Sequence, residues 1–282
     1  MPETTVVGTL YLERLSERDL RLLAGSEAPP APARLRAEPA RICERIAAPE
    51  VYDALFAPWV EEPFVLASPL LVFSVLLAQT ARELAGSTHI REWIGPGRRV
   101  PVFDVEGPRT FAADPLRRLF LAEVLASYTH VVSGSLLVRT RRGWARRRFS
   151  ELDPVRLAEL LEVVPPAERP VVYRRLGDLA LFLTGVFPDH VGERLFRPIQ
   201  VERITRLLGA ELDPASGDGA VGLLERLGRH AYGMAAEGIE TPTAGLASVL
   251  SEMPERFADA RRLLFVLTEH HLFPRRERWF GG

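Results

Sequence analysis

The sequence predicts a mostly α-helical fold, a multi-helix globular bundle with one small β-hairpin. Three leucine-rich runs follow a small polar residue and a proline, a pairing that starts helices because the polar side chain caps free amides and proline fits the first turn. Residues 171–187 carry a long apolar stripe at helical spacing, whereas residues 131–149 have the β-branched and aromatic content of a hairpin that turns at Arg142-Gly143. The three helix starts are Ser68-Pro69, Asp114-Pro115 and Asp153-Pro154.

Residues 1–60 are expected to form an N-terminal helical segment packed on the core. Val6 to Leu12 predicts a short strand because of its β-branched residues. A helix should follow, since Ser16 and Asp19 have the spacing of a capping box and Gly25 can end the helix.

The prolines of residues 29–32 predict a stiff linker that is neither helix nor strand. Pro39 and Pro49 then stand at the expected first positions of two short helices. Residues 61–209 should form the central helical core, which includes the Arg-rich hairpin, and residues 97–105 predict an extended loop or edge strand. The apolar stretch 64–78 is shorter than the roughly 20 residues that cross a bilayer, so it predicts a buried helix.

The stripe of residues 171–187 is expected to be the central core helix. Its apolar residues recur at steps of 4, 3, 4 and 3, which keeps them on one helical face. They are Val172, Leu176, Leu179, Leu183 and Val186.

Residues 210–282 are expected to form a C-terminal helical segment, although the pattern also fits one domain for the whole chain. Further helices are predicted near residues 199–208, 221–236, 244–250 and 255–270. The last of these ends in His270-His271, which we interpret as cations at a helix C-terminus or as a tail that docks on a partner.

Composition excludes several functional classes. Hydrophobic residues make up 47% and charged residues 26%, which excludes a disordered or collagenous chain, and the net charge of −1 means that any polyanion site must be local. All 36 basic residues are arginine, as in proteins of GC-rich genomes, and the absence of lysine excludes a phosphate-loop lysine or a Schiff base. Cys43 is the only cysteine, so a disulfide and a multi-cysteine zinc site are excluded. With no basic, apolar leader at the N-terminus, we expect a cytoplasmic protein that does not associate with membranes.

The segment 139–148 is the strongest candidate for a binding site, because it holds six positive charges, one tryptophan and no acid. Arginine grips anions and tryptophan can stack on a base. We expect a non-enzymatic binding or assembly protein whose partner is an acidic protein surface, a second copy of the chain or, as a further possibility, nucleic acid. Two alternatives stay open: the arginines keep an exposed hairpin soluble, or they pair with the acidic residues 210–260 of the same chain. The binding residues are Arg139, Arg141, Arg142, Trp144, Arg146, Arg147 and Arg148.

The alternative function is a metal- or cofactor-dependent enzyme with its site among the central helices. Acids on otherwise apolar helices need a partner, which is either a metal or a salt bridge such as Arg174 to Asp178. The pair His89 and Glu92 would share a face if it were helical. No zinc-protease motif occurs, and no cofactor is predicted outside this alternative, for which a metal is the candidate. Its candidate ligands are Glu123, His130, Asp178 and His190.

Overall fold

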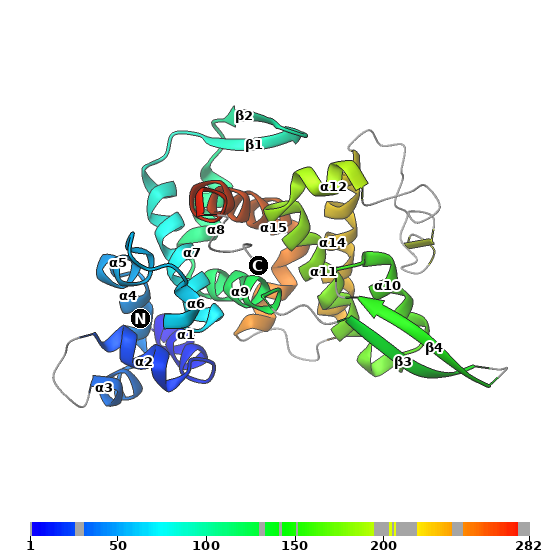
Figure 1. The fold of residues 1–282 in the computed structure, drawn as a ribbon, viewed down its shortest axis with the longest axis horizontal. Coiled ribbons are helices and arrows are strands. Elements are labelled where there is room, and N and C mark those ends of the chain that lie inside the picture. The colour runs from blue at the N-terminus through cyan, green and yellow to red at the C-terminus, as the bar shows by residue number, and fades with distance from the viewer. Residues whose placement is uncertain are drawn as a thin grey trace. The chain divides into compact units, whose positions relative to one another are not determined.

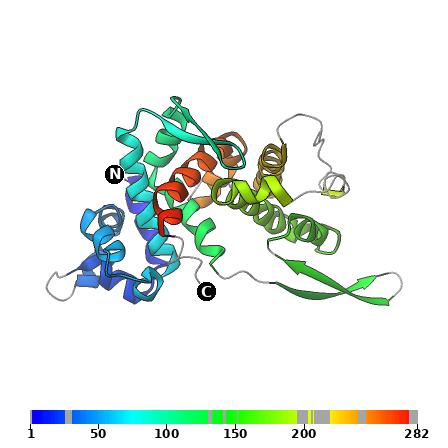
Figure 2. The same ribbon diagram turned by 45° about the horizontal axis from the view of Figure 1, so that its top comes forward.

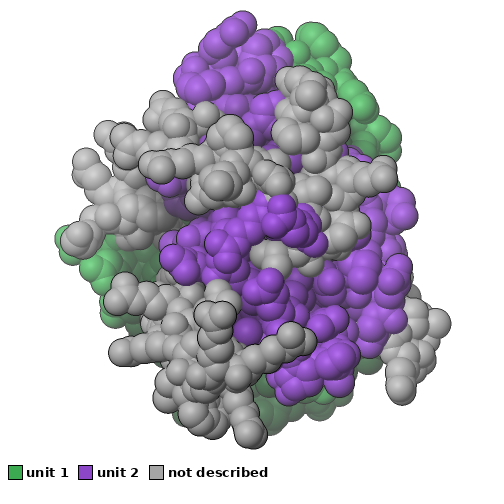
Figure 3. All heavy atoms as spheres, turned by 90° about the vertical axis from the view of Figure 1, so that its right-hand side faces the viewer, with its two compact units in different colours: residues 1–91, 101–129, 262–282 green, residues 92–100, 130–261 purple. Residues whose placement is uncertain are grey.

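The computed structural model describes residues 2–25, 31–129, 133–140, 143–150, 152–194, 203–204, 206, 219–238 and 245–275. The predicted mostly α-helical fold is confirmed (Figure 1), and the described residues also include two two-stranded sheets. The chain divides into two compact units, coloured in Figure 3. Unit 1 holds residues 1–91, 101–129 and 262–282, and unit 2 holds residues 92–100 and 130–261. The segment boundaries near residues 60 and 209 stay sequence-based predictions.

Unit 1 is built around helix α7, which packs against α8, α9 and α5, while α1 packs against α4 and α9. The side chains of Leu76, Phe111 and Phe120 are fully buried in its core. Its helices are α1 (Pro2–Leu12), α2 (Glu17–Ala24), α3 (Ala31–Ala37), α4 (Ala40–Ile46), α5 (Pro49–Phe56), α6 (Pro63–Leu66), α7 (Pro69–Gly86), α8 (Glu106–Ala113), α9 (Pro115–Ser127), the end of α15 (Leu246–Leu267) and the short turns η3 (Thr268–Leu272) and η4 (Phe273–Arg275).

The strand predicted at Val6 to Leu12 is wrong, because these residues belong to helix α1. Val7 and Tyr11, one helical turn apart, are both buried. Gly8 lies between them and faces α4 so closely that a Cβ atom there would be 2.0 Å from the carbonyl oxygen of Pro39. Packing on α4 therefore overrides the β preference of the local sequence.

The predicted linker at residues 29–32 is wrong at its end, where α3 already begins at Ala31. Proline at residue 32 fits there because the first turn of a helix needs no amide from it. Residues 29 and 30 lie outside the described residues. Pro49 is confirmed as the first residue of α5, whereas Pro39 is the N-cap of α4, which begins one residue later at Ala40.

The predicted capping box of α2 is confirmed and also holds a second helix. One carboxylate oxygen of Asp19 accepts hydrogen bonds from the amide and hydroxyl of Ser16, at 2.9 and 2.7 Å. The other oxygen accepts from the amide of Ser68, the N-cap of α7, at 2.8 Å. Asp19 is fully buried, so this one side chain fixes α2 against the start of α7.

Unit 2 is built on the packing of α11 against α14. The predicted apolar stripe is confirmed, because every one of its five residues is buried within α11. The elements of unit 2 are β3 (Ser133–Thr140), β4 (Gly143–Ser150), α10 (Pro154–Ala158), η1 (Glu159–Glu162), η2 (Pro166–Glu168), α11 (Arg169–Val186), α12 (Pro188–Arg194), α14 (Gly219–Glu237) and α15 up to Arg261.

The two helices predicted at residues 244–250 and 255–270 form one helix, α15, with Pro254 inside it. Met253 and Phe257, on either side of the proline, are fully buried, so packing holds the helix together across the interruption. The edge strand expected within residues 97–105 is β2 (Arg98–Val102), and its partner β1 (Ile90–Gly95) was not predicted. None of the helices in the described part of the chain combines the length and the apolar character that a membrane span requires.

Candidate functional site

The predicted arginine hairpin is present as the antiparallel pair β3 and β4, which Figure 2 shows running side by side as a twisted ribbon. Arg139 lies directly opposite Trp144 in the register. Opposite residues share a face of the ladder, and residues two apart along a strand share it too. Arg146 and Arg148 follow Trp144 at such two-residue steps. Four of the predicted binding residues therefore belong to one face, which we call the basic face: Arg139, Trp144, Arg146 and Arg148.

The other face of the ladder holds Arg147 among apolar residues. The register pairs Arg147 with Leu136 and Val138 with Ala145, and it places Phe149 on this same face. The hairpin is therefore amphipathic, and its arginines are not equivalent. Arg141 and Arg142 lie outside the described residues, and Gly143 opens β4 directly opposite Thr140.

Helix α10 holds the base of the hairpin. The carboxylate of Asp153 caps it by accepting hydrogen bonds from the amides of Val155 and Arg156, at 3.0 and 3.1 Å. β4 contacts α10. Beyond the helix, the buried carboxylate of Glu159 pairs with Arg203 at 2.9 Å. These contacts fix the point at which the ladder joins the helices of unit 2.

Part of the acidic stretch 210–260 is already paired with arginines outside the hairpin. Glu225 forms ion pairs with Arg229 at 2.8 Å and with Arg261 at 3.1 Å. Asp259 pairs with Arg256 at 3.0 Å. These two acids therefore neutralise arginines of α14 and α15.

The residues of the metal alternative take part in separate interactions. Glu123 on α9 forms an ion pair with Arg14. Asp178 on α11 accepts a hydrogen bond from the hydroxyl of Tyr232 at 2.9 Å, and the predicted salt bridge to Arg174 is confirmed at 3.9 Å. His190 lies on the short helix α12, and His130 lies outside the described residues. In the ranges that the structure describes, no three His, Cys, Asp or Glu side chains gather as a metal-binding group.

His89 and Glu92 do not share a helical face, because Glu92 lies in strand β1. Its carboxylate accepts a hydrogen bond from Arg261 at 2.6 Å. Arg261 is buried and also pairs with Glu225, so it joins β1, α14 and α15 within unit 2. The carboxylate of Glu92 is therefore engaged by an arginine within unit 2.

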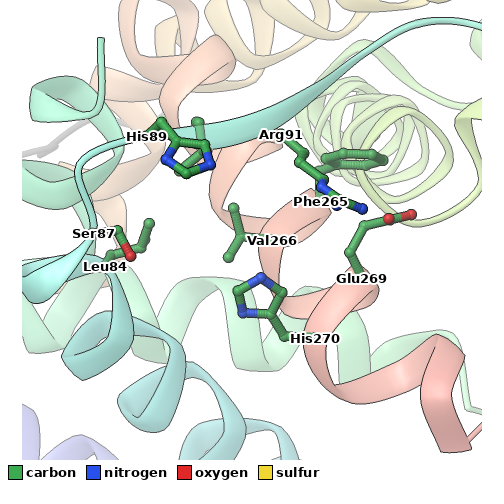
Figure 4. Close-up of a pocket in the computed structure, with 9 residues that line it drawn as sticks. Leu84, Ser87, His89, Arg91, Phe265, Val266, Glu269 and His270 are labelled. Carbon is green, nitrogen blue, oxygen red and sulfur yellow. The ribbon is translucent and has the colours of Figure 1, made fainter. Parts of the chain in front are cut away.

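The structure adds a pocket that the sequence analysis missed. It has a volume of about 290 Å³ and opens in unit 1 between the end of α7, the start of β1 and the end of α15 (Figure 4). Leu84, Ile90, Phe265 and Val266 form its apolar walls. The volume is at the lower end of the range for small-molecule sites.

The polar end of this pocket is organised by the carboxylate of Glu83. Its Oε2 atom lies 3.0 Å from Nδ1 of His270 and 3.3 Å from Nε2 of His271, and its Oε1 accepts a hydrogen bond from Gln79 at 2.8 Å. On the far side of His271, Nδ1 lies 3.3 Å from the hydroxyl of Tyr52. Two consecutive histidines thus converge on one carboxylate oxygen.

The ionisation of this cluster follows from its contacts. Burial opposes ionisation of Glu83, but hydrogen bonds from His270, His271 and Gln79 outweigh it and hold the pKa of this carboxyl well below its usual range. The hydrogen bond to Glu83 raises the pKa of His270, against a smaller opposing effect of burial. The cluster therefore favours an ionised Glu83 beside a protonated His270.

The convergence of the two histidines depends on the backbone of residues Thr268–Leu272, which form a π-helical turn at the end of α15. Such turns are rare and occur frequently at functional sites. The pair His270-His271 was visible in the sequence, but Glu83 lies 187 residues away from His270, so no local pattern connects them.

The chain matches no known protein family, and comparisons with curated proteins and with solved structures find no match either. A proposal about its function therefore depends on the hairpin and the pocket themselves.

Proposed function

We propose that the chain is a nucleic-acid-binding protein that contacts its target through the basic face of the β3–β4 hairpin. The observation that carries this proposal is the register, which assigns Arg139, Arg146, Arg148 and Trp144 to the same face. Arginines alone would suit any anion. A tryptophan among them adds a surface on which a base can stack, which single-stranded nucleic acids provide.

The spacing along the ladder supports the same partner. Residues two apart on a strand are separated by about 7 Å, which is the axial rise of two nucleotides in one strand of B-DNA. Arg146 and Arg148 have this separation, so both can reach the phosphates of one strand. A two-stranded ribbon also fits the major groove of a duplex.

An acidic protein surface is the competing partner. It would also pair with the arginines, and tryptophan is common at the centre of protein interfaces too. Direct binding of nucleic-acid probes and of polyglutamate therefore separates the two partners.

The test measures binding of labelled single-stranded and duplex DNA by fluorescence anisotropy at about 50 and 200 mM salt. If three phosphates are engaged, log K should fall against log salt with a slope of about −2 to −3, and the variant R139S/R146S/R148S should flatten it. The variant R18S/R21S/R98S removes the same charge from three other exposed arginines and should keep the slope. Circular dichroism checks that all variants fold.

Two single substitutions make the sharpest comparison. Arg146→Ser changes the basic face, and Arg147→Ser removes the same charge from the adjacent residue on the other face. We expect Arg146→Ser to weaken DNA binding several times more than Arg147→Ser. Trp144→Ala should weaken single-strand binding about tenfold. Equal effects of the two serine variants would refute the role of the face. If the wild type binds neither probe at the lower salt but binds polyglutamate, the partner is an acidic protein.

A further inference from the structure

We propose that the pocket of unit 1 is a binding site for a small organic carboxylate with an apolar body, held by His270 and Arg91. This site is independent of the hairpin and of the function proposed for it. His270 points into the pocket, apolar side chains form part of its walls, and charged side chains line it as well (Figure 4).

The imidazole of His270 is oriented from behind by Glu83. Its Nδ1 atom lies 3.0 Å from the Glu83 carboxylate, which fixes that nitrogen as the donor. In Figure 4 the other ring nitrogen, Nε2, points into the pocket towards Val266. When the ring is protonated, Nε2 presents an N–H group to whatever occupies the pocket. A ligand with an anionic oxygen satisfies that donor best.

The remaining lining specifies the rest of the ligand. Arg91 lines the pocket from β1, and its guanidinium group is a planar fork of donors that matches a carboxylate. The walls made by Leu84, Phe265 and Val266 are apolar and suit a hydrocarbon or aromatic body. Five of the nine lining residues are polar, namely Ser87, His89, Arg91, Glu269 and His270, and the other four are apolar. A pocket with apolar walls and placed polar groups is typical of a small-molecule site.

The charged groups that face His270 come from three elements, and one of them opposes an anion. His89, which also lines the pocket, and the adjacent His271 are the other histidines beside it. Glu83 from α7 and Glu269 from its own turn raise the pKa of His270, whereas Arg91 from β1 lowers it. Glu269 also lines the pocket, so its charge repels a bound carboxylate. Substituting Arg91 should therefore weaken the binding of a carboxylate, and substituting Glu269 should strengthen it.

The test uses 4-fluorobenzoate as the probe, with 4-fluorobenzamide as its uncharged counterpart, and follows binding to the full chain by fluorine NMR. At about pH 6, where a histidine beside a carboxylate is protonated, the benzoate should bind saturably and about tenfold more tightly than the amide. Arg91→Gln and His270→Gln should each weaken benzoate binding about tenfold, and Glu269→Gln should tighten it. Arg98→Gln, an exposed arginine outside the lining, should leave it unchanged.

Raising the pH to about 9 should weaken benzoate binding, because the carboxylate stays ionised while His270 loses its proton. This pH dependence should disappear in His270→Gln and persist in His89→Gln, which removes the other histidine of the lining. The proposal is overturned if benzoate does not bind saturably at about pH 6, if the amide binds as tightly, or if Glu269→Gln and Arg91→Gln change affinity in the same direction. A melting curve of each variant establishes that a loss of binding is not a loss of fold.

Discussion

Two glycines on helix α14 should respond in opposite directions to the same substitution by alanine. A Cβ atom at Gly228 would lie 2.4 Å from the ring of Phe257 and 2.9 Å from Cβ of Ala180. At Gly233, five residues further along the same helix, the nearest atom is Cγ of Pro254, at an ordinary 3.9 Å. The two positions therefore share a helix and differ in the space that a methyl group meets.

The magnitude of each effect follows from two opposing contributions. Alanine in place of glycine inside a helix stabilises it by about 0.5 to 1 kcal/mol, because glycine has more backbone freedom to lose. At Gly233 this gain stands alone. At Gly228 the new methyl group would overlap Phe257 by more than about 1 Å relative to a normal carbon contact, and overpacking of this kind costs about 1 to 3 kcal/mol or more. Phe257 is fully buried, so its ring cannot turn out into solvent to relieve the overlap, and we expect the cost to exceed the gain.

Thermal and urea unfolding of the full chain, followed by circular dichroism, measures both effects. Gly233→Ala should raise the midpoint temperature and Gly228→Ala should lower it, each by about 2 to 4 °C for every kcal/mol. A third variant, Gly177→Ala on α11, should also lower it, because a Cβ atom there would lie 2.7 Å from the ring of Tyr232. If Gly228→Ala stabilises the chain as much as Gly233→Ala does, the close packing of α14 on its neighbours is refuted.

Two further predictions concern ionisable groups. Partial burial raises the pKa of the half-buried Cys43 thiol to about 11, although Arg118 opposes this. Cys43 should therefore react with a thiol reagent far more slowly in the folded chain than in urea, and equal rates would contradict this protection. Hydrogen bonds from Arg99, Trp93 and the amide of Gly97 lower the pKa of Asp189 to about 2, against the opposing effect of burial. The ionised Asp189 therefore stabilises the fold above about pH 4, and this stabilisation is lost as the pH falls towards 2. The difference in midpoint temperature between wild type and Asp189→Asn should therefore shrink over that range, and a difference that does not change with pH would count against the assignment.

The helix starts could be predicted from sequence because their signals are local. The side chains of Ser68, Asp114 and Asp153 each accept a hydrogen bond from an amide in the first turn of the helix that follows, so a few neighbouring residues determine each start. Residues 6–12 were mispredicted as a strand because contacts with distant residues decide their secondary structure. Helix α1 packs against α4, which begins only at Ala40, and Val7 is buried. The helix therefore forms despite its β-branched residues.

The two candidate sites also differ in whether their residues are close together in the sequence. The hairpin and its arginines could be predicted because strand content and charge are contiguous in the sequence, but the separation of Arg146 from Arg147 needed the pairing register. The pocket could not be predicted, since its lining comes from two segments, residues 84–91 and 265–270, that are far apart in the sequence. Only the fold brings Glu83 to His270, and only a π-helical turn directs two consecutive histidines to one oxygen.

The two proposals can fail separately, and this independence makes the pair of tests stronger than either alone. Every residue of the pocket belongs to unit 1, and every residue of the basic face belongs to unit 2. A substitution such as Arg91→Gln should therefore leave the salt dependence of DNA binding unchanged, and R139S/R146S/R148S should leave benzoate binding unchanged. If one substitution abolished both activities while the chain stayed folded, the two sites would be energetically coupled, and the ligand of the pocket would be a regulator of the hairpin. If each substitution affected only its own site, the chain would combine two independent binding functions.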